Sequence, residues 1–183
     1  MKELFIKYKS VIKFILTFLL VYIILSILYK LYLQYSNGVK FYPDYVTHMV
    51  SKQVEALLNI IGYRAEVLPH PDEPSIKVIV NNRYLVRVIE GCNAFSVIIL
   101  FISFILAFSG KARATLIYLI LGSILIYIGN VLRIVVLTMG MYHYPKYESI
   151  LHNVVFPIVI YGMVFFLWFF WVNRFSKLNK KNA

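Results

Sequence analysis

The chain has 183 residues, of which 61% are hydrophobic, 17% aromatic and 15% charged, and its mean hydropathy is +0.75. This composition excludes a soluble globular domain and indicates an integral membrane protein. The formal net charge of +11 requires no nucleic-acid partner, because basic residues beside membrane spans reflect topology and contact anionic lipids.

Four apolar stretches are candidates for crossing a hydrocarbon core about 30 Å thick. They are 11–33, 94–108, 114–137 and 154–172. The second is the shortest, and it reaches across only if Cys92, Asn93 and Ser109 are counted with it, at about 1.5 Å of rise per residue. No small-residue cleavage site follows the first stretch, so we interpret it as a retained anchor.

Basic residues gather in three regions: before and at the start of the first stretch, between the second and third, and after the fourth. They are Lys2, Lys7, Lys9, Lys13, Lys111, Arg113, Arg174, Lys177, Lys180 and Lys181. The segments 34–91 and 138–153 instead balance basic with acidic side chains. Because Lys and Arg are retained on the cytoplasmic side, we predict cytoplasmic termini and an outer segment 34–91.

The segment 34–91 contains its own secondary-structure signals. Apolar residues follow helical spacing from Val46 to Ile61, after a start signal at Pro43 and Asp44 and before Gly62. This helix is expected to lie on the bilayer or to cap the bundle. Residues 76–80 and 84–89, joined through Asn81 and Asn82, read as a β-hairpin, with 63–68 as a candidate third strand.

We therefore predict an α-helical integral membrane protein forming one domain over residues 1–183. Its fold class is a four-span bundle with a small external helix and a β-hairpin insert. The hairpin runs directly into Glu90, Gly91 and Cys92, so it is expected to hold the cysteine in place.

Cys92 is the only cysteine, which excludes an intramolecular disulfide and a CxxC motif. The second span must run inward, so Cys92 is expected at its outer end, in the first helical turn. The positive end of a helix favours an anion such as a thiolate or an oxyanion. Ser96 lies one turn further on, and Asn93 adds a polar group. The alternative is a small apolar filler, which position alone does not overturn.

Arg133 falls in the outer third of the third span. A charge at the centre of a span costs about 2.5 to 3.5 kcal/mol on insertion scales, and such a residue usually has a partner. Asn130 lies three residues earlier on the same helical face, so the two can point into the bundle. The alternative is an arginine that extends outward to lipid phosphates.

His152 directly precedes the fourth span, whose Pro157 is tolerated near a first helical turn. His48, His70 and His143 compete for any role assigned to it. Cys92, Arg133 and His152 are all expected at one membrane depth, where they supply a nucleophile, a cation and a base or thiolate partner. No pair of His or acidic residues at ligand spacing accompanies His152, so we predict neither a metal nor a cofactor.

Three short motifs resemble those of exosortases and archaeosortases, which are membrane transpeptidases that process C-terminal sorting signals. The motifs are Glu90-Gly91-Cys92-Asn93-Ala94, Asn130-Val131-Leu132-Arg133-Ile134 and the later His152. The resemblance covers about residues 84–172 and implies that Cys92 is the nucleophile, Arg133 the stabilising cation and His152 the third catalytic residue. The chain departs from the family in having Cys-Asn-Ala where Cys-Ser-Gly is common, and in having about half the usual number of spans. This short form looks most like the exosortase F branch.

The predicted function is that of a cysteine peptidase or transpeptidase at the outer face of a bacterial plasma membrane, acting through a thioester. Expected partners are exported proteins with a C-terminal transmembrane sorting signal, membrane lipids and a small membrane partner protein, without nucleic acid. The alternative is a non-enzymatic binding or assembly subunit that recognises an anionic group through Arg133.

Overall fold

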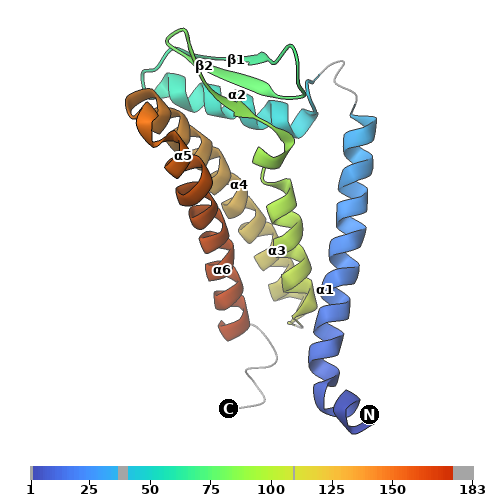
Figure 1. Ribbon diagram of the computed structural model, residues 1–183. Coiled ribbons are helices and arrows are strands. Elements are labelled where there is room, and N and C mark those ends of the chain that lie inside the picture. Colours follow the sequence, from blue (N-terminus) through green and yellow to red (C-terminus); the bar gives the residue numbers. More distant parts are fainter. Residues whose placement is uncertain (1, 37–40, 109, 175–183) are drawn as a thin grey trace.

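The computed structural model describes residues 2–36, 41–108 and 110–174, without the side chains of residues 2–7, 148, 152 and 156. Ser109 and the basic residues Lys177, Lys180 and Lys181 lie outside these ranges. Long helices run alongside one another, and a shorter helix with a small sheet covers one end of them (Figure 1). The start of the first helix and the end of the last helix in the described ranges both lie at the opposite end (Figure 1).

Three helical segments in the described ranges are long and apolar enough to cross a membrane: Tyr8–Tyr35, Ala112–His143 and Asn153–Arg174. They belong to α1 (Lys2–Tyr35), to α4 (Ala112–His143) and to α6 (Phe156–Arg174) with the turn before it. Short elements connect α4 to α6, namely η2 (Pro145–Tyr147), α5 (Glu148–Ile150) and the π-helical turn η3 (Leu151–Val155). The prediction of a helical membrane protein with a small β-structure is confirmed.

The predicted span 94–108 differs from the other three. It is helix α3 (Phe95–Ala107), whose 13 residues rise only about 20 Å, short of a hydrocarbon core about 30 Å thick. Cys92 was expected in the first turn of this helix, but it lies before it, in the separate 3-10 turn η1 (Glu90–Cys92). The helix cannot extend back to Cys92, because Ala94 is left-handed, with a φ of 70°.

The external helix α2 (Tyr45–Ile60) forms where the start and stop signals predict it. The Asp44 carboxylate caps it, since Oδ1 accepts hydrogen bonds from the amides of Val46 at 2.9 Å and Thr47 at 3.0 Å. After the last turn, Gly62 has a φ of +102°, a conformation that suits glycine. The helix packs against both the sheet and α4, so it caps the bundle.

The sheet has three antiparallel strands in the order β1 (Ala65–Pro69), β2 (Ile76–Val80) and β3 (Arg83–Val88). The hairpin and the candidate third strand are therefore confirmed. Asn81 and Asn82, with φ values of 48° and 63°, form the hairpin turn, because asparagine tolerates the positive φ that a right-twisted two-residue turn requires. Strand β3 leads almost directly into η1 (Figure 1).

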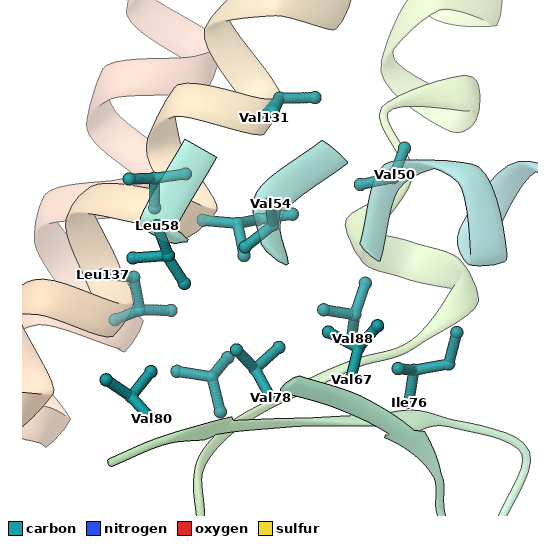
Figure 2. Packing of buried hydrophobic residues seen from close by; sticks show 13 residues of the cluster. Val50, Val54, Leu58, Val67, Ile76, Val78, Val80, Val88, Val131 and Leu137 are labelled. Atoms are coloured by element: carbon teal, nitrogen blue, oxygen red, sulfur yellow. The ribbon is translucent and has the colours of Figure 1, made fainter. Parts of the chain in front are cut away.

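Two apolar cores hold these layers together. In the first, one face of α2 is enclosed between the sheet and the part of α4 that contains Val131 and Leu137 (Figure 2). Its fully buried members include Val50, Val54, Leu58, Val78 and Val88. The second core joins α3, α4 and α6 around Phe101, Ile126 and Trp171. The first core thereby fixes the sheet to α4, which carries Arg133.

The Phe101 ring of α3 packs directly against Gly122 of α4, and we expect this contact to matter for stability. A Cβ on Gly122 would collide with the Phe101 ring, whereas a Cβ on Gly162 in α6 would have no neighbour within 4 Å. We expect Gly122→Ala to destabilise the protein by about 1 to 3 kcal/mol through overpacking. The matched Gly162→Ala should be neutral or stabilising by up to about 1 kcal/mol, since alanine favours helices.

Unfolding of the purified protein in detergent, followed by circular dichroism, measures both effects. Equal stability of the two variants would contradict the close packing of the Phe101 ring against Gly122.

Candidate active site

A cavity of about 390 Å³ lies where β3, η1, α4 and the start of α6 meet. Cys92 lines it from η1 and Arg133 lines it from α4, so the structure brings two of the three predicted catalytic residues together. The remaining lining residues are Val86, Arg87, Val88, Ile89, Gly91, Ile134, Leu137, Asn153 and Pro157. The volume is within the range of small-ligand pockets.

The backbone of Cys92 is held from two sides. Its amide donates to the carbonyl of Ile89 at 2.8 Å, which closes the 3-10 turn. Its carbonyl accepts a hydrogen bond from Asn130 Nδ2 at 2.6 Å, and Asn130 is only 2% exposed. Since Asn130 and Arg133 share a face of α4, the same helical face fixes the thiol-bearing turn and presents a guanidinium group to the cavity.

The side chain of Asn93 contacts α1 and α2, whereas the backbone of Cys92 contacts α4. The fully buried amide of Asn93 donates to Tyr29 Oη at 2.8 Å and to Thr47 Oγ1 at 3.2 Å, and its oxygen accepts from the Phe95 amide at 3.0 Å. Asn93 therefore ties η1 to α1 and α2 and satisfies an amide at the start of α3. It supports the position of Cys92 and is not among the described residues that line the cavity.

Ala94 follows with a φ of 70° and is almost fully buried. A residue with a Cβ pays about 1 to 2 kcal/mol for this conformation, which glycine adopts freely. The tight reversal between η1 and α3 explains why glycine would suit this position.

Ser96 lines another cavity. It is exposed and faces a space of about 470 Å³ between α1 and α3, which Tyr29, Lys30 and Glu90 also line. The Glu90 side chain is largely exposed, yet partial desolvation raises the pKa of its carboxyl group, and the nearby Asp44 carboxylate adds to this. The structure thus places Ser96 in a different cavity from Cys92.

His152 belongs to the turn η3, and its side chain lies outside the described residues. Its neighbour Asn153 and the following Pro157 line the Cys92 cavity, so the backbone of this turn borders the site.

The three competing histidines have other surroundings. The ring of His48 lies 5.5 Å from that of Phe41, His70 Nε2 lies 3.6 Å from Glu73 Oε1, and His143 Nε2 is hydrogen bonded to Tyr63 Oη at 2.7 Å. None of the three is among the described residues that line the Cys92 cavity.

Arg87 is a residue of the site that the sequence analysis did not single out. It lines the cavity from β3, and its Nη1 contacts Glu73 Oε1 at 2.8 Å and Oε2 at 2.9 Å. This hydrogen-bonded guanidinium lowers the pKa of Glu73. The sequence shows Arg87 only as an outward position on a strand, and its proximity to Cys92 depends on how β3 turns into η1.

The described lining therefore combines one thiol with two guanidinium groups and contains no acidic side chain. No ion pair between described side chains involves Arg133. Positively charged groups beside a nucleophile favour an oxyanion that forms there during acyl transfer.

The comparisons with known proteins agree with the ordered motifs. The model of a family described as transmembrane exosortase matches residues 6–173 of the chain. No curated protein and no solved structure matches it. The matched range includes Cys92, Arg133 and His152.

Arg87 is the second cation beside Cys92, and we expect it to affect the reactivity of the thiol. Arg87→Gln should slow modification by a negatively charged methanethiosulfonate about threefold to tenfold relative to a neutral one, because a nearby charge changes the local concentration of ions. Arg83→Gln is the matched control, since Arg83 lies on the same strand and stacks over Tyr142 at 5.9 Å. Mass spectrometry of the only thiol gives both rates, and the same reagent preference in all three proteins would show that Arg87 does not act on Cys92.

Proposed function

The chain belongs to the transmembrane exosortase family, and we propose that it is a cysteine peptidase or transpeptidase that processes C-terminal sorting signals through a thioester. The observation that carries the proposal is the shared cavity of Cys92 and Arg133, which come from separate elements. The family match supports a transmembrane protein that processes sorting signals. The thiol and the guanidinium supply the two groups that acyl transfer needs.

In the proposed reaction, Cys92 Sγ attacks the carbonyl carbon of a substrate peptide bond while the thiol proton passes to the His152 imidazole. The tetrahedral intermediate collapses with breakage of the C–N bond, and the imidazole returns the proton to the leaving amine. An amine, hydroxyl or water then attacks the thioester and releases the thiol. Neither half-reaction requires a metal or a redox cofactor.

Arg133 is proposed to stabilise the oxyanion, because its guanidinium presents several fixed donors in a site with few competing polar groups. Asn130 is a positioning residue, since its hydrogen bond to the Cys92 carbonyl holds the nucleophile beside the face that carries Arg133. Positioning of this kind accounts for part of the barrier reduction.

The proposed location is the outer face of a bacterial inner membrane, with both termini in the cytoplasm. The separation of basic residues along the sequence supports this orientation. The arrangement of the fold is compatible with it, since the start of α1 and the end of α6 lie at the end of the bundle away from the sheet (Figure 1). A substrate anchored by its own C-terminal helix would present the adjoining peptide at the level of Cys92.

The alternative is a non-enzymatic membrane subunit that binds an anionic group. Two guanidinium groups around one cavity favour anion binding whether or not the thiol reacts. The two functions differ in their dependence on Cys92, because binding should survive replacement of the thiol and thioester chemistry should not.

We expect Cys92→Ser to reduce processing of membrane-anchored exported proteins to below about one part in a thousand, as loss of a nucleophile does elsewhere. Ser96→Ala is the control, since Ser96 lines a different cavity. The C-termini of membrane proteins from cells with each variant are compared by mass spectrometry. Wild-type processing by Cys92→Ser would favour the non-enzymatic alternative.

The proposed role of His152 predicts a specific loss of thiol reactivity. His152→Ala should slow alkylation of Cys92 by iodoacetamide near neutral pH about tenfold or more. The thiolate is the species that reacts, and the variant lacks the imidazole proposed to take the thiol proton. His48→Ala, His70→Ala and His143→Ala are the controls, and they should react at the wild-type rate. Alkylation rates are measured between pH 5 and 10 on folded protein in detergent. A loss in one of the controls instead would reassign the base.

A further inference from the structure

Strand β3 has one free edge. The strand order β1-β2-β3 makes β3 the last strand of the sheet in the described part of the chain. Its other edge is paired with β2 along its length, from Val88 opposite Ile76 to Arg83 opposite Val80. An unpaired edge carries backbone N–H and C=O groups that are ready to pair with another extended chain.

The Cys92 cavity runs along this free edge. It is lined by the consecutive residues Val86, Arg87, Val88 and Ile89. Successive side chains of a strand point to opposite faces of the sheet, and here Val86 and Val88 are buried while Arg87 and Ile89 are exposed. A space that contacts residues of both faces must lie beside the edge of the strand. Since β2 occupies one edge, the cavity lies at the other.

The free edge of β3 also leads to the proposed nucleophile, Cys92. Strand β3 ends at Val88 and the turn η1 begins at Glu90, so the cavity continues from the edge to Gly91 and Cys92. Arg133, Ile134 and Leu137 of α4 form another part of the cavity wall. An extended chain between this wall and β3 would be directed at the sulfur.

We propose that the free edge of β3 binds the substrate as an additional β-strand, which delivers the scissile carbonyl to Cys92. The occupant is thus an extended peptide segment recognised mainly through its backbone, a recurring way in which sheets bind peptides. This inference rests on the proposed function and specifies how its substrate is held. In this mode of binding the backbone contributes more than the side chains. The substrate must therefore be extended, and its backbone N–H groups at alternate positions must be free to donate hydrogen bonds.

The test uses peptide chloromethyl ketones as probes, in which the thiolate displaces chloride and forms a thioether. We compare an acetylated alanyl ketone with an acetylated tetra-alanyl ketone on the intact protein in detergent. The longer probe should label Cys92 about tenfold faster, because it can form more backbone hydrogen bonds with the edge of β3. Cys92 is the only cysteine, so the labelled site is unambiguous.

Two N-methylated tetra-alanyl ketones provide matched controls. One carries methyl groups on its first and third amides and the other on its second and fourth. In a strand pair only alternate residues direct their N–H groups to the neighbour. One pattern should therefore reduce the rate to that of the short probe, while the other should retain the advantage. Equal rates for the short and long probes, or equal effects of the two methylation patterns, would overturn the proposal.

Amide hydrogen exchange of residues 85–89 gives a second readout that does not depend on thiol chemistry. A tetra-alanyl amide with the tolerated methylation pattern should slow exchange in this segment, and the amide with the other pattern should not. Equal exchange with both would also overturn the strand proposal. The proposed function has a separate criterion, because it fails if Cys92→Ser still processes membrane-anchored proteins.

Discussion

The hydrogen bond from Asn130 Nδ2 to the Cys92 carbonyl, 2.6 Å long, is the contact on which the site depends. A polar amide inside an apolar helix is costly unless it finds a partner, and Asn130 is almost fully buried. The carbonyl of the turn η1 is that partner. One interaction therefore satisfies Asn130, fixes the turn that carries the thiol and orients the face of α4 from which Arg133 lines the cavity.

The turn η1 is anchored on its other side by Asn93, whose amide reaches Tyr29 of α1 and Thr47 of α2. Strand β3 enters the turn and α3 leaves it, so elements from most of the described chain meet there. This convergence has a local cost, because Ala94 must adopt a left-handed conformation. It also explains the short α3, since the residues that would have lengthened the helix are used to hold Cys92.

The charge of the cavity comes from two different layers of the fold. Arg133 is contributed by a membrane-spanning helix, while Arg87 is contributed by the sheet and is held by Glu73 at 2.8 Å. A substrate that lies between them would contact a helix on one side and a strand edge on the other. The small sheet is thus more than a support for the cysteine, because it forms one wall of the proposed peptide site.

Local patterns in the sequence determined much of this protein: the long apolar helices, the capped helix α2, the hairpin at Asn81 and Asn82, and the motifs around Cys92 and Arg133. These features depend on hydrophobic length, periodicity and turn chemistry, which act between near neighbours. Only the tertiary structure decided that α3 begins no earlier than Phe95, that Ser96 faces another cavity and that Arg87 lies beside Cys92. The first outcome depends on the left-handed conformation of Ala94. The last depends on the packing of β3 against α4, which is a contact between distant segments that no local pattern encodes.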